Sequence, residues 1–278
     1  MSIEYSLAGS YLFIGTSIGL AIWYLLAQFV NQEEAKKYAD KMMKVTIVLA
    51  IIGVILATLH LGRMERFIYL ILNPSSWLAR EGLCAGAFTG GIILYYLLIR
   101  NKNQEIPKYA ALLYVVILAG VCTLISMGMI YASVSAIPAW NNTLFVLVNI
   151  CSSLLLGGIL FLVVTKGSLA PESYKTYIIS LLAVALLSLV INITYEAHVN
   201  MVLNNLALQG AAVPSVWLGA VVRIVVGLLV PAYLIYKILS PQNNKSANYI
   251  NITLACIIVG EVMAKIMHFM VGVKGPFL

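Results

Sequence analysis

The chain has 278 residues, of which 62% are hydrophobic and only 10% are charged. Soluble domains carry about a quarter charged residues, so this composition excludes a soluble globular protein and indicates a chain that lies in a lipid bilayer. The net charge of +7 does not point to nucleic-acid binding, because no basic stripe is interleaved with aromatic residues.

A helix needs about 20 apolar residues to cross the hydrocarbon core, and breakers such as proline separate eight such runs. We therefore predict an all-α integral membrane protein with one domain over residues 1–278, since the loops are too short to bury a core. The N-terminus lacks the features of a cleaved signal, so the first helix is expected to be retained. The predicted spans are Leu7–Val30, Val45–Leu61, Glu81–Ile99, Tyr109–Ala132, Leu144–Thr165, Thr176–His198, Val216–Leu239 (kinked at Pro231) and Tyr249–Val271.

The distribution of lysine and arginine predicts the orientation of these spans. If the N-terminus is outside, eleven of the seventeen basic residues fall in inner loops and flanks and four in outer ones. Cytoplasmic loops carry such an excess, so we expect both termini outside the cell membrane. The second and sixth runs each end in histidine at the outer face, which suggests two four-helix bundles in the same orientation, although coincidence explains the pattern equally well.

Ionisable groups inside a bilayer are costly and usually mark function. All of those found here fall in the outer halves or near the middle of the predicted spans. A proton pump or ion-coupled transporter needs polar groups across the whole thickness, so the pattern favours a substrate that arrives through lipid and protons that leave outward. The residues concerned are His60, Arg80, Glu81, Glu196, His198, Arg223, Glu261, Lys265 and His268.

A quinol is such a substrate, because its head group carries two hydroxyls and its tail is apolar. Its oxidation needs two proton acceptors, and a neutral histidine and a carboxylate can serve as the two acceptors. His60 and Glu81 end and begin consecutive spans on one face, so we predict that they form the catalytic pair. The residues expected to bind the quinol beside this pair are Arg80, Tyr131, Trp140 and Arg223. Tyr131 could add a hydrogen bond to a quinone oxygen, and Trp140 could wall the ring or belong to an interfacial belt. The groups expected to have a structural or relay role are Glu196, His198, Glu261, Lys265 and His268.

Several of the other residues have simpler interpretations. Glu261 and Lys265 are four apart in the order that favours an ion pair within one helix, and Arg223 could neutralise Glu196 or Glu261. His268 could be an ordinary interfacial residue.

No metal site is predicted. The four cysteines, Cys84, Cys122, Cys151 and Cys256, lie in apolar runs without a CxxC spacing. A haem needs histidines that face each other within the bundle. The three histidines lie near the outer boundary, which disfavours haem and leaves only His60 with His198 as an alternative. Electrons must then leave for a cofactor in a partner docked outside.

Short motifs resemble one known family. The segments T-L-H-L-G-R (58–63), S-S-W-L-A-R-E-G (75–82), Y-A-S-V-S-A-I-P-A-W (131–140) and G-E-V-M-A-K (260–265) resemble the membrane anchor subunit of dimethyl sulfoxide reductase, the DmsC type. The length and the eight-span plan agree over the whole chain. The wider group of polysulfide-reductase anchors has a similar plan.

This resemblance implies a complex for anaerobic respiration in which the anchor binds menaquinol. An iron–sulfur subunit with four clusters would pass the electrons to a molybdopterin subunit that reduces the terminal acceptor. The family's quinol-site histidine and glutamate fall on His60 and Glu81. A polysulfide- or thiosulfate-reductase anchor, a small-solute transporter and an anchor without quinone remain as alternatives.

Overall fold

The structure is a computed structural model that describes residues 2–60, 68, 72–100, 108–166, 168–211, 213–239 and 246–273. Within these ranges the regular secondary structure is entirely helical, and eight helices are long and apolar enough to cross a membrane. The predicted all-α multi-span architecture is therefore confirmed.

Each predicted span corresponds to one helical segment, and most boundaries agree within a few residues. The seventh span is built from three consecutive helical pieces. The elements are α1 (Ser2–Val30), α2 (Gln32–His60), α4 (Trp77–Ile99), α5 (Ala110–Ala132), α6 (Leu144–Val164), α7 (Pro171–Leu208), α8 (Trp217–Val221), η3 (Val222–Leu229), α9 (Val230–Ile238) and α10 (Ser246–Val273).

Two helices are longer than the apolar runs that predicted them. α2 begins at Gln32, where the side chain of Asn31 accepts a hydrogen bond from the backbone of Glu34. α7 has 38 residues, or about 57 Å at about 1.5 Å per residue, against a hydrocarbon core of about 30 Å. A search for apolar runs misses the start of α2 because its residues are polar yet helical, and it ends α7 too early because asparagines interrupt the apolar residues beyond His198.

The seventh span contains a π-helix, η3, directly before Pro231. Pro231 has no backbone N–H, and the N–H of Val230 bonds to the carbonyl of Val225, five residues earlier. The irregularity expected at Pro231 is thus a wide helical turn that precedes the proline. π-Helical turns are rare and occur often at functional sites, and η3 carries the buried Arg223.

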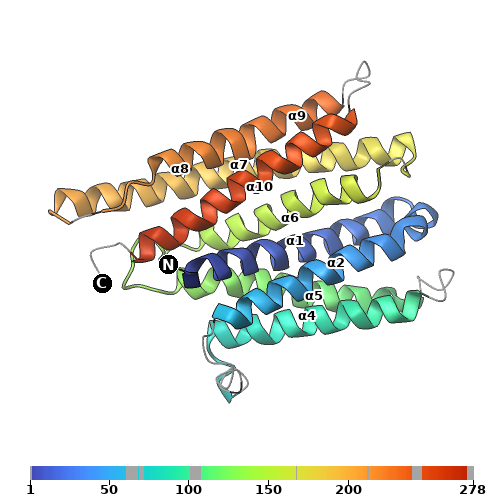
Figure 1. Cartoon of the computed structure of the whole chain (residues 1–278), viewed down its shortest axis with the longest axis horizontal. Helices are drawn as coiled ribbons and strands as arrows, with labels where there is room; N and C mark the ends of the chain where they lie inside the picture. The colour runs from blue at the N-terminus through green and yellow to red at the C-terminus, as the bar shows by residue number, and fades with distance from the viewer. Residues whose placement is uncertain are drawn as a thin grey trace.

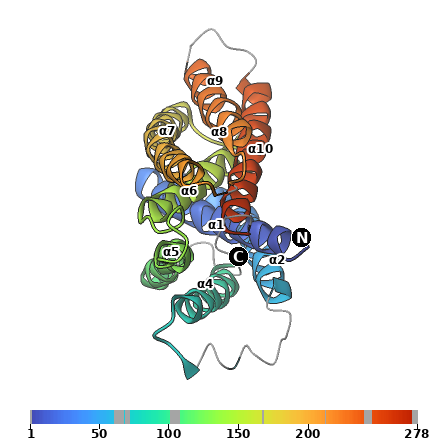
Figure 2. The same ribbon diagram turned by 90° about the vertical axis from the view of Figure 1, so that its left-hand side faces the viewer.

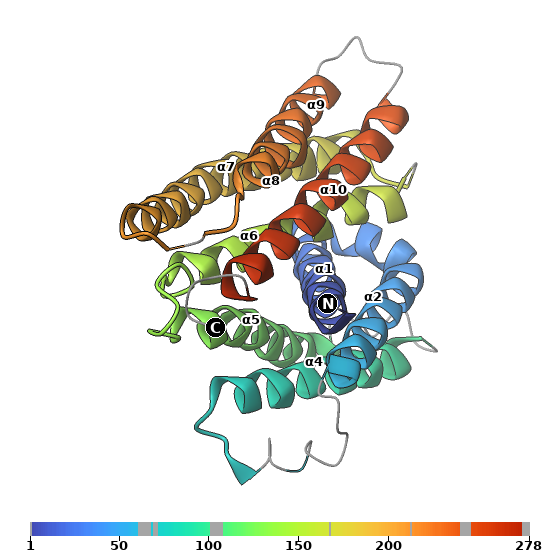
Figure 3. The same cartoon turned by 60° about the vertical axis from the view of Figure 1, so that its left-hand side comes forward.

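The helices pack as two groups of four spans, α1, α2, α4 and α5 in one and α6, α7, α8–α9 and α10 in the other (Figures 1 and 2). The groups meet where α1 packs against α6, and α10 also contacts both of these helices. The start of α1 and the end of α10 lie at the same end of the bundle, beside the end of α2 and the start of α4 (Figure 1). Figure 3 shows that α1 and α6 lie at the centre.

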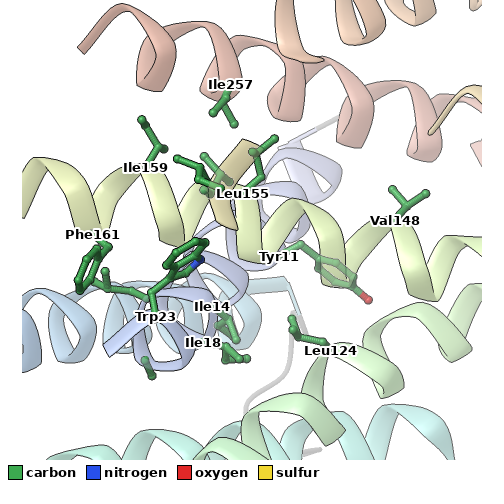
Figure 4. Packing of buried hydrophobic residues seen from close by; sticks show 14 of the residues in the cluster. Tyr11, Ile14, Ile18, Trp23, Leu124, Val148, Leu155, Ile159, Phe161 and Ile257 are labelled. Carbon is green, nitrogen blue, oxygen red and sulfur yellow. The ribbon is translucent and has the colours of Figure 1, made fainter. Parts of the chain in front are cut away.

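Glycines allow α1 and α6 to approach closely. A Cβ added to Gly19 would lie 1.8 Å from the carbonyl oxygen of Ser153, and one added to Gly157 would meet the backbone of Gly19. Small residues serve this purpose in membrane helices, where packing rather than the hydrophobic effect drives association. Large side chains, including Ile14, Ile18 and Leu155, surround the contact (Figure 4).

Candidate functional site

Glu81 occupies the second turn of α4, at the end of the bundle where α1 starts and α10 ends. α4 starts after Ser76, whose hydroxyl caps the helix by accepting the N–H of Ala79 at 3.1 Å. Glu81, Ala85 and Phe88 follow one another at helical spacing and form the inward face of α4. Glu81 is therefore only 8% exposed, whereas Leu83 faces outward. Its carboxyl group therefore points into the protein.

Two tyrosines from other helices lie near Glu81. Tyr11 of α1 and Tyr131 of α5 are both buried, with ring centroids 6.1 Å apart, and both interact electrostatically with the Glu81 carboxyl group. The Tyr11 hydroxyl donates to the carbonyl of Met127 at 3.1 Å. A carboxyl group beside two phenols can bind the hydroxyls of a substrate head group and accept a proton from one of them.

An aromatic cluster lies next to Tyr131 and surrounds His268 of α10. The imidazole stacks on Phe145 with centroids 3.7 Å apart and on Trp140 at 5.4 Å, and Tyr131 meets it edge-on at 4.7 Å. The Tyr195 hydroxyl lies 3.0 Å from Nδ1 of His268. His268 is 4% exposed, so its interpretation as an interfacial residue is wrong. Trp140 packs in this cluster as well.

A cluster of buried charges lies deeper in the second helix group. The Arg223 guanidinium reaches Oε1 of Glu261 at 2.5 Å and donates to Asn192 at 3.1 Å and Ser152 at 3.0 Å. Lys265 donates to Oδ1 of Asn149. Of the two partners expected for Arg223, Glu261 therefore makes the ion pair. Lys265 binds an amide rather than Glu261, although the two are four residues apart on α10.

Two small cavities border these clusters. The first, about 10 Å³, is lined by Tyr11, Asn149, Ser152, Ser153, Glu261 and Lys265 among others. The second, of the same volume, is lined by Glu196, Tyr195, Trp140 and His268 with apolar neighbours. Each has room for about one water molecule.

The other predicted site residues are distributed as follows. The side chain of His60 lies outside the described residues. Arg80 is exposed, and its guanidinium lies 4.5 Å from the centroid of Trp77. Glu196 lines the second cavity, and Nε2 of His198 is buried without a described partner. Arg223 makes its contacts in the second helix group, so the structure does not bring it to Glu81.

Sequence reasoning missed the uncharged members of the site. Tyr11, Asn149, Ser152 and Asn192 are all buried and contact the charged groups or the first cavity. Their signal is visible in the sequence, because Asn149 with Ser152 and Ser188 with Asn192 repeat at helical spacing inside apolar runs. Apart from Tyr131 and Trp140, the predicted site residues were all charged residues or histidines.

A third polar cluster lies at the opposite end of the bundle. Glu34 of α2 is buried and accepts the backbone N–H of Ala170, which precedes α7. Glu34 lies outside the predicted spans, and it belongs to a helix because α2 begins earlier than predicted. The hydroxyls of Tyr24, Tyr38 and Tyr177 are buried without hydrogen-bond partners among the described residues.

The comparison with known families decides the family of this chain. The model of the DMSO reductase anchor subunit (DmsC) family matches residues 2–271. The chain belongs to the DmsC family. No curated protein matches the chain. Membership confirms the resemblance found in the sequence motifs and shows a DMSO reductase anchor subunit.

For a DmsC protein, the eight apolar helices are those of a multi-pass membrane protein. An anchor subunit implies catalytic and electron-transfer partner subunits in general. Among the described residues no group of three or more His, Cys, Asp or Glu side chains could hold a metal ion.

Proposed function

We propose that this DmsC-family chain oxidises menaquinol at Glu81 and passes the electrons to an iron–sulfur partner subunit. The observation that carries the proposal is a buried carboxyl group at one end of the bundle, near enough to two phenols, Tyr11 and Tyr131, to interact with them electrostatically. A carboxyl group is costly to bury in a membrane and usually marks function there. Quinol oxidation would use this group as a proton acceptor.

In the proposed reaction the quinol head group binds beside Glu81, with its tail in lipid. Glu81 accepts one proton from a quinol hydroxyl, and His60 accepts the other. Two electrons leave for the nearest iron–sulfur cluster of the partner, and the products are the quinone and two protons. Tyr131 orients the ring by a hydrogen bond to a quinone oxygen. A molybdopterin subunit then reduces the terminal acceptor.

We place this site at the outer face of the cell membrane, with both termini outside. α2 starts, α6 ends and α7 starts at the end of the bundle opposite the start of α4 (Figure 1), and these segments and their flanks carry lysines, among them Lys36, Lys41, Lys166 and Lys175. Basic residues favour the cytoplasmic side, so Glu81 faces outward. Electrons and protons then leave on the same side, and little charge crosses the membrane during turnover.

The substitution Glu81→Gln tests the proposal. It keeps size and hydrogen bonding but removes the proton acceptor, and loss of a general base costs typically about 10²–10⁴-fold in rate. We expect quinol-dependent reduction of the partner's iron–sulfur clusters, followed by electron paramagnetic resonance, to slow at least about 100-fold. Assembly of the complex, followed by co-purification, should be unchanged.

The matched control is Glu172→Gln, which changes an exposed glutamate in the first turn of α7 and should leave the rate unchanged. Wild-type rates in Glu81→Gln, with intact assembly, would show that the chain anchors its partners without binding quinol at this site.

A small-solute transporter is the weaker candidate. Between Ser153 and Thr165, α6 carries only apolar residues and glycine, a length of about 16 Å at about 1.5 Å per residue. This layer separates the clusters near Glu81 and Lys265 from the tyrosines at the other end. Solute uptake into liposomes by the chain alone would favour transport over quinol oxidation.

A further inference from the structure

The two cavities lie on either side of a pair of buried basic residues, Lys265 and His268, which are three apart on α10 and one turn from each other. Each cavity also borders a buried polar atom that has no hydrogen-bond partner among the described residues. In the first cavity this atom is Nδ2 of Asn149, a residue that is 3% exposed, and in the second cavity it is Nε2 of His268. Buried polar groups are normally satisfied by protein or by ordered water.

Both cavities have the size and the polarity that an internal water molecule needs. A buried water requires room for about one molecule and two to four polar partners. The first cavity offers the Lys265 ammonium, the Asn149 amide and the hydroxyls of Ser152 and Ser153. The second offers the carboxyl group of Glu196, the imidazole of His268 and the Tyr195 hydroxyl.

The first cavity lies on the side of the proposed quinol site, and the second lies on the side of α7. Tyr11 lines the first cavity and interacts electrostatically with Glu81. Glu196 lies on α7 in the second helix group, and α7 continues for twelve residues beyond it, to Leu208. Polar groups therefore run sideways across the bundle, from α4 to α7.

We propose that each cavity binds a water molecule, and that the two waters join Glu81 to Glu196 through Tyr11, Lys265 and His268 into a path for proton transfer. In one transfer a proton enters at Glu81, each intermediate group accepts one proton and passes one on, and a proton leaves at Glu196. No electron moves along this path, and no intermediate group changes its charge.

The path gives protons an exit that a docked partner leaves open. This reasoning rests on the proposed function, in which an iron–sulfur subunit covers the end of the bundle near Glu81 so that electrons have a short distance to travel. Protons released from quinol at that position would meet the partner. An exit along α7, in the other helix group, lies to one side.

Three substitutions on three helices interrupt the path while keeping side-chain size. They are Lys265→Met on α10, Asn149→Leu on α6 and Glu196→Gln on α7. In the assembled complex we expect each substitution to slow quinol-dependent cluster reduction by about 10- to 100-fold. This effect is no larger than the smallest typical loss, about 100-fold, for removal of a direct proton acceptor. The solvent deuterium isotope effect should rise, and the quinol KM should not change.

Thr253→Val is the matched control, since Thr253 is a buried α10 residue whose hydroxyl has no described partner and which lines neither cavity. Its rate and isotope effect should equal those of the wild type. Because a variant can fail to assemble, the waters are also sought directly, in a cryo-electron microscopy map of the wild-type complex fine enough to show ordered solvent. Density in both cavities supports the path.

Empty cavities would overturn the inference, as would wild-type rates and isotope effects in both Lys265→Met and Glu196→Gln. These results differ from failure of the proposed function. If Glu81→Gln slows cluster reduction and the path variants do not, quinol oxidation stands and the path is wrong. If the wild-type complex shows no quinol-dependent reduction, the proposed function itself is wrong.

Discussion

Arg223 illustrates at the scale of one residue how this protein holds charge inside the membrane. Its guanidinium has no solvent exposure and contacts three helices, through Glu261, Asn192 and Ser152. A buried ion pair contributes little net stability, because desolvation offsets its attraction, yet removing one partner leaves an uncompensated buried charge. Arg223 therefore constrains how the helices pack more than it adds to stability.

We predict that Arg223→Met destabilises the protein by about 3–5 kcal/mol, the range typical for breaking a buried pair. The double variant Arg223→Met/Glu261→Gln removes both charges, keeps a polar group near Lys265, and should recover most of the loss. Thermal unfolding of the purified protein in detergent measures both. Equal losses in the single and double variants would show that the guanidinium acts through its bonds to Asn192 and Ser152.

Charge was the main guide to single residues in the sequence, which explains both the site residues that it identified and the polar residues that it missed. Glu81, Arg223, Glu261 and Lys265 were identified because each is an ionisable residue in an apolar run. Their pairing depends on which helices are neighbours, and spacing along α10 favoured Glu261 with Lys265. The structure pairs Glu261 with Arg223 instead, because η3 packs against α10.

At the scale of the element, the contact between α1 and α6 joins the two helix groups. Gly15 and Gly19 form a small-residue pattern on α1, opposite Ser153 and Gly157 of α6. Added methyl groups here would meet backbone or Ser153, which cannot easily move aside. Overpacking of this kind costs typically about 1–3 kcal/mol and occasionally more.

We therefore predict that Gly19→Ala lowers the amount of folded protein in the membrane and its thermal stability, with a loss of at least about 1–3 kcal/mol. The control is Gly86→Ala on α4, because a Cβ at Gly86 meets nothing within 4 Å. That control should be neutral or slightly stabilising, since alanine is the better helix former. Unchanged amount and thermal stability of the Gly19→Ala protein would mean that α1 and α6 can move apart without a loss of stability.

Hydropathy predicted the existence of every spanning element but not its full extent. The polar first half of α2 and the last turns of α7 are helical because of capping, local ion pairs and packing, to which an apolar-run search is blind. The π-helix η3 is equally hidden, since Pro231 indicates an irregularity without specifying its form. Helix count was thus easier to predict than helix ends.

At the scale of the whole molecule, the bundle has two chemically different ends. One carries Glu81, the start of α1 and the end of α10, and the other carries the start of α2, a segment that contains several lysines (Figure 1). The family shows that this is an anchor subunit, so one end must receive its partners. Under the proposed function, we expect the lysine-rich end to face the cytoplasm, where basic residues are favoured, and the Glu81 end to serve docking and electron transfer.

Cysteine labelling in intact cells tests this orientation. Ser75 precedes α4, Asn204 lies near the end of α7, and Ser168 lies in the connection before α7 at the opposite end; all three are exposed. We predict that a membrane-impermeant maleimide labels Ser75→Cys and Asn204→Cys in intact cells and labels Ser168→Cys only after lysis. The unsubstituted protein gives the background, because its four cysteines lie within the spans.

Cells that express the anchor without its partners provide the second sample, so that docking cannot hide Ser75 or Asn204. The reverse pattern, with Ser168→Cys labelled before lysis and the other two only afterwards, would place Glu81 at the cytoplasmic face. Quinol oxidation there would release its protons into the cytoplasm and pass its electrons to a partner on that side. The electron-transfer subunit would then dock inside the cell, although Glu81 and its two tyrosines could still bind the quinol.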